Sequence, residues 1–204
     1  MNKNSVMRLY QYRKSLYRLK QMGFVKVFSE NLADAVNVTA AQVRHDFSVF
    51  GLVGNKRGGY TVTELIASLD KKLGKDKVQN VIVVGAGNIG KALLNYKGFE
   101  TEKIKIAAIF DSEPSKIDHK LPAPILPMSD LKDFVSKHKV EVGVIAVPDV
   151  HAQQVLDEMV KAGIQGVLNF APIRLNPPSE DFVINHVNVG LELETVIYLV
   201  HSLK

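Results

Sequence analysis

Three glycines at a fixed spacing come directly after an apolar run, in the segment Gly85-Ala86-Gly87-Asn88-Ile89-Gly90. In a strand, turn and helix unit, the first glycine makes the turn, the second lets the backbone approach a pyrophosphate, and the third lets the helix pack on the strand. The N-terminus of the following helix offers N–H groups and the positive end of a dipole to the phosphates. The segment therefore predicts a cradle for the phosphates of a nucleotide.

Asp111 ends the next apolar run and lies 21 residues after Gly90. This spacing is close to the roughly 20 residues expected for a carboxylate that binds the adenosine ribose of a dinucleotide. A carboxylate in that place repels a 2′-phosphate, so the pattern favours NAD(H) over NADP(H). Two alternatives remain open, namely a domain that keeps the turn and binds no ligand, and one that binds coenzyme A.

The composition is typical of a folded protein of one or two domains, since the 204 residues are 46% hydrophobic and 23% charged. The chain has no cysteine, which excludes a disulfide framework, a thiolate metal site and a catalytic thiol. Its histidines lack metal-ligand spacing, its N-terminus lacks the apolar core of a signal peptide, and no apolar run reaches the ~20 residues of a membrane span. We therefore expect a cytoplasmic protein with no metal and no membrane partner.

The charge is unevenly distributed along the chain. Residues 1–77 carry 14 Lys and Arg against 6 Asp and Glu, a net charge of +8, whereas residues 78–204 carry 12 against 15, a net charge of −3. A basic first third joined to a slightly acidic remainder suggests one module that meets a polyanion and one that does not. The polar, lysine-rich segment 70–80 is the expected linker between them.

The basic part has the pattern of a helix-turn-helix. An apolar stripe at spacings of three and four residues predicts a first helix over 5–22, with Leu9, Tyr12, Leu16 and Leu19 facing the core. Residues 25–28 resemble a short strand, Ser29 is placed to cap a second helix, and Asn37 ends it. A further helix after a short turn completes the motif.

That third helix has two chemically different faces. Thr39 and Gln42 have the spacing of a capping box at its start, and Val43, Phe47 and Phe50 share its buried side. Small and polar residues lie on the other side and suit a major groove. We expect DNA contacts from Thr39, Ala41, Gln42, Arg44, His45 and Ser48.

Glycines surround a pair of cations in the segment 51–62, which predicts a β-hairpin wing with Lys56 and Arg57 at its tip. Such a wing lies on phosphates or enters the minor groove. The alternative for this part of the chain is a helical interaction module with a solvated basic loop.

The remainder alternates strand and helix signals, which predicts a parallel, doubly wound sheet. The expected strands are 81–84, 105–110, 123–126, 141–147, 166–170 and 182–187. Helices are expected over 129–138, where Ser129 is placed as the cap, and over 150–162.

Ligands on such sheets bind beyond the C-terminal ends of the strands, at the point where the strand order reverses. We therefore expect Val147, Pro148 and the turn Asn169-Phe170-Ala171-Pro172 near the nicotinamide half of a dinucleotide, with Asn169 bonded to the carboxamide. The alternative is that these are ordinary turns between strand and helix.

The last segment, 190–204, is apolar on more than one side. A helix of this kind must be buried, and its own short domain cannot cover all of it. We therefore expect a homodimer that buries the helix and presents two basic modules to a two-fold-symmetric DNA site.

Over nearly its whole length, the chain resembles the Rex family of bacterial redox-sensing repressors. The matching stretches are 38–44, 46–48, 50–51, 84–96, 109–111, 146–148 and 166–172, and the last, Gly-Val-Leu-Asn-Phe-Ala-Pro, is specific to that family. The resemblance implies a homodimer of winged-helix and Rossmann subunits that exchange a C-terminal helix. It also implies operator binding that NADH abolishes and NAD+ permits, with Tyr96 beside the cofactor.

Several positions differ from the family pattern. His45 stands where the family usually has Lys, Val49 where it has Tyr, and the wing reads Lys56-Arg57-Gly58-Gly59-Tyr60 instead of Arg-Gly-Val-Gly-Tyr. The resemblance places these positions on the DNA-contacting surface, so the operator sequence does not follow from it.

Asn188 replaces an Asp that the family is expected to use in coupling cofactor state to domain posture. The resemblance implies a charged contact between that Asp and the first helix, at Lys14 or Arg13. The neutral Asn188 either weakens this switch or is a tolerated change.

These patterns predict an α/β protein with a winged helix-turn-helix domain over 1–77, a Rossmann domain over 78–188 and a swapped dimerisation helix over 189–204. The predicted function is a transcriptional repressor that reads the NADH/NAD+ ratio on double-stranded DNA. Uncharged NADH is expected to enter an apolar pocket at Phe170-Ala171-Pro172 more readily than NAD+, because burying an unpaired charge is costly.

Two other functions fit the pattern less well. An NAD-dependent dehydrogenase needs a substrate domain, which the chain lacks, and a recognisable acid or base beside the nicotinamide turns. A coenzyme A-binding regulator is disfavoured because Asp111 would repel a ribose that carries a 3′-phosphate. We therefore expect no catalytic residue.

Overall fold

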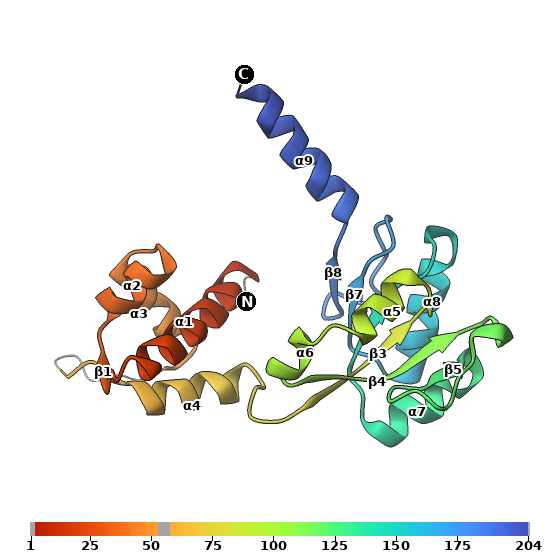
Figure 1. The fold of residues 1–204 in the computed structure, drawn as a ribbon, viewed down its shortest axis with the longest axis horizontal. Coiled ribbons are helices and arrows are strands. Elements are labelled where there is room, and N and C mark those ends of the chain that lie inside the picture. The colour runs from red at the N-terminus through yellow and green to blue at the C-terminus, as the bar shows by residue number, and fades with distance from the viewer. Residues whose placement is uncertain (1–2, 53–57, 204) are drawn as a thin grey trace. The chain divides into compact units, whose positions relative to one another are not determined.

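The computed structural model describes residues 3–52 and 58–203. The chain forms two compact units, Met1–Val78 and Gln79–Lys204 (Figure 1). No helix in the described ranges is both long and apolar enough to cross a membrane.

The first unit is a small helical domain. Its elements are α1 (Lys3–Gln21), β1 (Lys26–Val27), α2 (Ser29–Val36), α3 (Ala40–Val49), β2 (Tyr60–Thr61) and α4 (Val62–Lys72). The apolar stripe predicted for the first helix is buried at Leu9, Tyr12 and Leu16 and partly buried at Leu19. β1 pairs antiparallel with β2, which places the strand after the wing segment against the strand before α2.

Two caps of this unit differ from the sequence-based expectation. Ser29 is already inside α2 and is not its cap; the backbone N–H of Phe28 donates to Asn31 Oδ1 at 2.8 Å instead. At α3, the Thr39 hydroxyl accepts from the Gln42 N–H at 3.1 Å, as expected. The Gln42 side chain, however, does not return to Thr39, because its amide donates to the Asp46 carboxylate at 2.9 Å.

The first residues of the expected linker 70–80 belong to helix α4. α4 buries the apolar residues Val62, Leu65, Ile66 and Leu69. Its Asp70 accepts hydrogen bonds from Arg13 and, at 2.8 Å, from the Tyr17 hydroxyl. The expected linker 70–80 is therefore wrong at its N-terminal end, because the first of its residues hold α4 against α1.

The second unit is built on a six-stranded, parallel sheet in the order β5-β4-β3-β6-β7-β8. The strands are β3 (Gln79–Val84), β4 (Ile104–Asp111), β5 (Ile125–Pro127), β6 (Val142–Ile145), β7 (Gly166–Asn169) and β8 (Val183–His186). The chain runs outward from β3 to β5 and then returns to the other side of β3 at β6. The strand order therefore reverses between β3 and β6, as a doubly wound fold requires.

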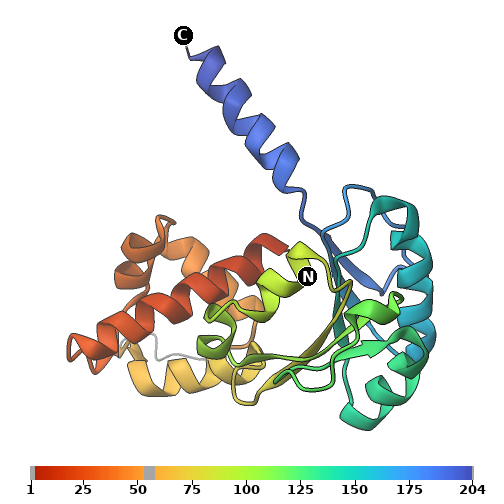
Figure 2. The same ribbon diagram turned by 45° about the vertical axis from the view of Figure 1, so that its right-hand side comes forward.

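Helices cover both faces of this sheet (Figure 2). On one face, α7 (Leu131–His138) and α8 (Asp149–Ala162) pack on Ile82 and Val84 of β3. On the other, α5 (Asn88–Leu94) and α6 (Gly98–Thr101) pack near Val83. Alternate residues of β3 thus face opposite layers, which explains why the whole strand is apolar.

The start of α7 differs from the expectation at Ser129. This residue lies in the 3₁₀ turn Met128–Asp130, and its hydroxyl donates to Asp130 Oδ1 at 3.0 Å. Asp130 is therefore the residue before α7, and Ser129 does not cap the helix.

The last helix, α9 (Val189–Ser202), has no buried residue. Its apolar side chains are about half exposed or more, including Leu193 at 60% and Ile197 at 48%. Asn188 is its N-cap, and the side-chain oxygen accepts from the Leu191 N–H at 3.0 Å.

Candidate functional site

The glycine turn follows β3 and leads into α5. Gly85 has φ +110°, and a Cβ there would lie 2.3 Å from the carbonyl oxygen of Ala146 on the neighbouring chain segment. A Cβ at Gly90 would lie 2.0 Å from the carbonyl oxygen of Gly85. Both positions therefore require glycine for folding: the first for its φ and close contact, the third for packing of α5 on the turn.

Gly87 differs from its neighbours because a Cβ there would meet nothing within 4 Å. The first intrahelical bond of α5 runs from the Lys91 N–H to the Gly87 carbonyl at 3.0 Å. The N–H groups of Asn88, Ile89 and Gly90 therefore have no partner within the helix. Open space beside backbone donors at a helix N-terminus fits a pyrophosphate, as the sequence predicted.

Asp111 ends β4 beside this turn and is only 8% exposed. Its Oδ2 accepts from the Ala86 N–H at 2.7 Å and its Oδ1 from the Glu113 N–H at 2.9 Å. Burial favours the neutral carboxyl, but these two N–H groups and the Lys116 ammonium outweigh it and hold the pKa of Asp111 below its usual range. Asp111 is therefore ionised at neutral pH, in the form that accepts hydrogen bonds from a ribose.

Ala86 has a different role from the one predicted. It is 1% exposed, and its N–H is directed to Asp111 rather than into open space. The sequence placed it among the ligand contacts because it lies inside the glycine motif. In the structure the Ala86 N–H instead orients the Asp111 carboxylate through a hydrogen bond.

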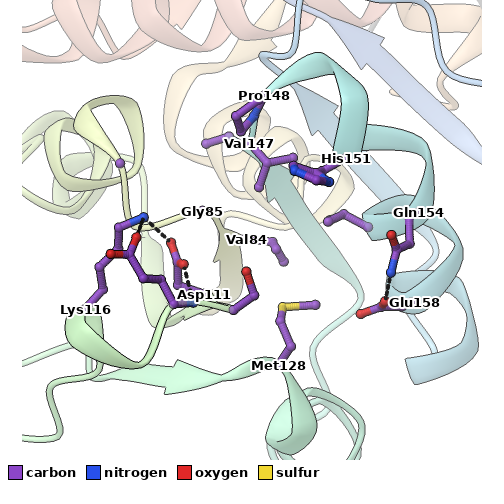
Figure 3. Close-up of a pocket in the computed structure, with 15 residues that line it drawn as sticks. Val84, Gly85, Asp111, Lys116, Met128, Val147, Pro148, His151, Gln154 and Glu158 are labelled. Carbon is purple, nitrogen blue, oxygen red and sulfur yellow. Dashed lines mark hydrogen bonds and ion pairs between the residues drawn. The ribbon is translucent and has the colours of Figure 1, made fainter.

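A cavity of about 400 Å³ opens beside the turn, between the ends of β3, β4 and β6 and the first turns of α8 (Figure 3). Five of the predicted cofactor residues line it, namely Gly85, Gly87, Asp111, Val147 and Pro148. Apolar walls come from Val84, Met128, Ala146 and Val155. Val147 and Pro148 share this cavity with Asp111, and their contact with the nicotinamide half stays a prediction.

Several polar side chains of the cavity were missed by the sequence reading, namely Glu113, Lys116, His151, Gln154 and Glu158. Lys116 Nζ lies 2.7 Å from Glu113 and 3.4 Å from Asp111. His151, Gln154 and Glu158 all lie on α8, at spacings of three and four residues, so the helix period could have placed them on one side.

Among the predicted cofactor residues that do not line this cavity are Tyr96, Phe170, Ala171 and Pro172. Tyr96 follows α5, is 60% exposed and stacks edge-on with Phe99, with ring centroids 5.0 Å apart. Phe170, Ala171 and Pro172 follow β7, and Ala171 belongs to the core. A contact of these residues with a nicotinamide stays a prediction.

Asn169 was expected to bind the nicotinamide carboxamide, but its side chain is fully buried. The Oδ1 atom accepts from the Ala171 N–H at 3.0 Å, and Nδ2 donates to the carbonyls of Ala171 and Ile173 at 3.1 and 2.9 Å. Nδ2 also lies 3.1 Å from His186 Nδ1. The carboxamide contact is therefore not supported: Asn169 holds the turn after β7.

The second candidate site is the exposed side of α3. Thr39, Ala41, Arg44, His45 and Ser48 are all exposed, whereas Val43, Phe47 and Phe50 are buried, as the two-faced pattern predicted. Arg44 lies 3.4 Å from Glu30 of α2, and both side chains are more than half exposed. Lys56 and Arg57 of the predicted wing lie outside the described residues.

One buried carboxylate holds α3 against α1. Asp46 is 1% exposed and accepts from Arg8 at 2.6 and 2.7 Å, from the Tyr12 hydroxyl at 2.9 Å and from Gln42 at 2.9 Å. Burial opposes its charge, but the Arg8, Tyr12 and Gln42 hydrogen bonds outweigh burial and lower the pKa of Asp46. The same burial and the Asp46 contact raise the pKa of Tyr12. The orientation of the exposed face of α3 thus depends on a bidentate ion pair.

The described residues contain no group of three or more His, Asp or Glu side chains placed to hold a metal ion.

Comparison with known families matches the two units separately. Residues 2–48 match a model described as the N-terminus of putative DNA-binding proteins, and residues 76–173 match a model described as a CoA binding domain.

Comparison with known proteins covers nearly the whole chain. The redox-sensing transcriptional repressor Rex of Carboxydothermus hydrogenoformans is 40% identical over 195 residues, which is 95% of this chain and 93% of that protein. The Rex protein of Lactobacillus acidophilus is 38% identical over 99% of this chain and 96% of its own length.

Among solved structures, the Rex-family repressor RSP in complex with NAD+ and operator DNA matches with a TM-score of 0.90. The sequences are 33% identical, and the match covers 99% of this chain and 93% of RSP. RSP has also been solved in complex with NADH, and that structure matches with a TM-score of 0.81. The resemblance inferred from the sequence motifs is confirmed: this chain belongs to the Rex family of redox-sensing transcriptional repressors.

Proposed function

We propose that this protein is a transcriptional repressor that binds operator DNA as a homodimer and is released from it by NADH. The observation that carries the proposal is the likeness over 99% of the chain to RSP, a repressor solved with operator DNA and NAD+ and also with NADH. The two candidate sites described above supply the chemistry that each partner needs.

The nucleotide half of the proposal rests on the glycine turn and Asp111. Open space at Gly87 and the N-terminus of α5 suit a pyrophosphate, and the ionised Asp111 beside them suits an unphosphorylated ribose. The two carboxylates of Asp111 and Glu113 outnumber the one ammonium of Lys116 between them, and this net negative charge disfavours both the 2′-phosphate of NADP(H) and the 3′-phosphate of coenzyme A. We therefore propose NAD(H) as the ligand, although the family model for this region is described as CoA-binding.

The DNA half rests on α3, whose exposed side carries small and polar residues. We propose that Arg44 and His45 contact the edges of bases, and that Thr39 and Ser48 contact the DNA backbone. Lys56 and Arg57 are proposed to contact phosphates. Because part of the affinity then comes from phosphate neutralisation, binding should fall steeply as salt rises.

The homodimer is proposed from α9. Its exposed apolar side chains, among them Leu193, Val196 and Ile197, are what a second copy of the helix would cover. Exchange of this helix between subunits is the arrangement that the family resemblance implies. A two-fold dimer would present two α3 helices to two half-sites of the operator.

The redox response is proposed to come from nicotinamide charge. Burial beside Phe170, Ala171 and Pro172 costs more for the cationic NAD+ than for NADH, so the two bind in different postures. Since a ligand shifts a conformational equilibrium only through its different affinity for the two states, this charge difference is the physical source of the switch.

A test that needs no knowledge of the operator uses fragmented genomic DNA from the source organism. The protein is immobilised, loaded with fragments at one salt concentration and eluted in parallel with NADH, NAD+ or coenzyme A. Specific fragments released by NADH alone are the expected result, and sequencing them yields the operator.

Three other outcomes have distinct meanings. Release by coenzyme A would assign that ligand instead. Fragments that no nucleotide releases would show a DNA-binding protein whose switch is lost, with Asn188 the first position to restore. Turnover of NADH with a panel of carbonyl substrates would contradict the assignment as a non-enzymatic regulator.

A further inference from the structure

The cavity has a pair of polar side chains that neither the glycine turn nor Asp111 uses. Gln154 and Glu158 lie one turn apart on α8 and both line the cavity. Gln154 Nε2 donates to Glu158 Oε1 at 3.0 Å, which orients the amide of the first and occupies one oxygen of the second. Figure 3 shows this pair on the wall opposite Asp111 and Lys116, with Met128 between the two walls.

The position of Asp111 determines what would lie between these walls. In the proposed function the Asp111 carboxylate binds the adenosine ribose, and the base is bonded directly to that ribose. The cavity beside Asp111 is lined by Val84, Met128 and Val155, which offer apolar contact to the faces of a flat ring. The base would therefore lie in this cavity with its polar edge toward α8.

The pair offers a hydrogen-bond donor beside an acceptor. The Gln154 amide keeps a second N–H in addition to the one that Glu158 accepts, and the Glu158 carboxylate keeps further acceptor positions. The edge of adenine presents a ring-nitrogen acceptor beside the 6-amino donor, which is the complementary pattern. Hypoxanthine has a carbonyl oxygen at position 6 and an N–H at position 1, so it would place an acceptor against the carboxylate.

We propose that Gln154 and Glu158 read the 6-amino edge of the adenine base and make the site selective for adenine over 6-oxopurine nucleotides. This inference rests on the proposed function, because it needs a dinucleotide whose ribose is held by Asp111. It adds to that function a specificity for the base, which the glycine turn and Asp111 cannot provide.

Helix α8 supplies a matched control pair. Gln153 Nε2 donates to Asp157 Oδ1 at 3.0 Å, so this pair also joins a Gln amide to a carboxylate four residues later, as the Gln154 and Glu158 pair does. Gln153 is also bonded to the backbone of Asn176, and neither Gln153 nor Asp157 lines the cavity. A change at Asp157 therefore alters the charge of α8 equally without touching the base.

The experiment is a fluorescence titration with NADH and with reduced nicotinamide hypoxanthine dinucleotide. The wild-type protein is expected to bind NADH at least about ten-fold tighter, because hypoxanthine loses the hydrogen bond to Glu158 and places an acceptor against its carboxylate. Glu158→Gln, whose amide can turn to face either base, should reduce this preference to about two-fold. Asp157→Asn should keep the wild-type preference.

The possible outcomes distinguish the base-reading role of Gln154 and Glu158 from the proposed binding of NADH. Equal affinity of the wild-type protein for both nucleotides, or a preference unchanged in Glu158→Gln, would overturn the base-reading role while leaving NADH sensing intact. Binding of neither nucleotide would overturn the proposed function and this inference together. Circular dichroism of each variant shows that a change in preference comes from a folded protein.

Discussion

At the scale of single residues, the glycines of the turn are needed for different reasons. A Cβ at Gly90 would collide with the backbone oxygen of Gly85 at 2.0 Å, and no side-chain rotation can relieve that contact. Gly87 has φ −79°, which any residue can adopt, and the space beside it is open. Position 90 is therefore fixed by folding, whereas we predict that position 87 is fixed by the ligand.

Gly87→Ala is expected to change the free energy of unfolding by less than about 0.5 kcal/mol, as at other uncrowded surface positions. It should weaken NADH binding by at least about ten-fold, because the methyl group occupies the place where backbone approaches the pyrophosphate. Thermal unfolding without nucleotide and a fluorescence titration with NADH measure the two effects. Gly90→Ala is the control and should lose about 2 kcal/mol or more of stability; wild-type NADH affinity in Gly87→Ala would contradict the assigned cradle.

Asp46→Asn is expected to destabilise the first unit by about 2 kcal/mol at pH 7, because charge-assisted hydrogen bonds to Arg8 are lost. The lowered pKa of Asp46 fixes the sign of the pH dependence. Its contribution to stability is fully present above the ordinary aspartate pKa of 3.8 and is lost as pH falls through the lower pKa of the folded state. The difference between wild type and Asp46→Asn should therefore shrink below pH ~4.

Urea unfolding followed by tyrosine fluorescence measures this difference. The chain has no tryptophan, and the first unit holds most of the tyrosines, namely Tyr10, Tyr12, Tyr17 and Tyr60. Asp34→Asn serves as control, because that carboxylate is exposed on α2 and should have little effect at any pH. A stability difference that stays constant down to pH 3 would show that Asp46 is not the titrating group.

The roles of single residues were predictable where the backbone geometry requires one residue type. They were less predictable where a side chain could form hydrogen bonds with several different groups. The spacing of Gly85, Gly87, Gly90 and Asp111 was sufficient because a βαβ unit has little freedom at those points. Asn169 was assigned to the ligand, yet it holds its own turn, since Asn side chains readily bond to nearby backbone. Gln42 likewise bonds to Asp46, because donating its amide to a carboxylate makes a charge-assisted hydrogen bond, which is stronger than the neutral bond that it would accept from the Thr39 N–H.

At the scale of elements, the Arg44 side chain of α3 has two competing partners, namely Glu30 of α2 and the proposed DNA. Arg44 lies 3.4 Å from Glu30, and an exposed pair of this kind contributes little to stability. Arg44→Ala is expected to weaken operator binding by about ten-fold if it contacts a base edge. Glu30→Ala should strengthen binding several-fold, because it removes a negative charge beside the DNA surface.

Fluorescence anisotropy with the operator and with a scrambled duplex, at one salt concentration, separates the two effects. Loss of affinity for the operator alone assigns Arg44 to base reading, and equal loss on both duplexes assigns it to phosphate contact. No change on either duplex would remove Arg44 from the interface. Double substitution at Arg44 and Glu30 is the control for their mutual contact.

The last helix carries a prediction about assembly. A chain ending before Gly190 is expected to sediment as a monomer at concentrations where the full chain is a dimer, because the exposed apolar residues of α9 are removed. Circular dichroism should still show the folded sheet, since α9 contributes no buried residue to it. A stable dimer of the shortened chain would mean that another surface holds the subunits together.

Elements with strong periodicity were predicted well, and their ends less well. All six strands of the sheet were anticipated, because the central parallel strands are apolar runs bounded by turns and the edge strand β8 still has a short apolar run. α4 was missed because its C-terminal residues, Lys71 and Lys72, look like a linker, although Leu65, Ile66 and Leu69 face the core. Short turns such as α6, with four residues, carry no periodic signal at all.

At the scale of the whole molecule, the division of charge matches the division into two units. The basic unit presents α3, and the slightly acidic unit holds the nucleotide cavity, so each ligand has its own module. Neither module alone can be a redox switch, because the response requires a coupling free energy between two sites. Asn188 bears on this coupling: it caps α9, a task that Asp performs equally well, but it lacks the charge that the family resemblance gives to this position.

The coupling can be measured in both directions, and thermodynamics requires the two answers to agree. If NADH weakens operator binding by a given factor, saturating operator must weaken NADH binding by the same factor. For a functioning switch this factor should be about 5 to 150. Asn188→Asp is expected to increase this coupling factor by restoring the charge, while leaving the cap of α9 and the intrinsic NADH affinity unchanged.

Titrations of NADH with and without operator, and of operator with and without NADH, give both factors. A factor of one in the wild type that rises in Asn188→Asp would show a repressor whose sensor binds NADH but has been uncoupled at this residue. A factor of one in both would place the source of coupling elsewhere in the chain.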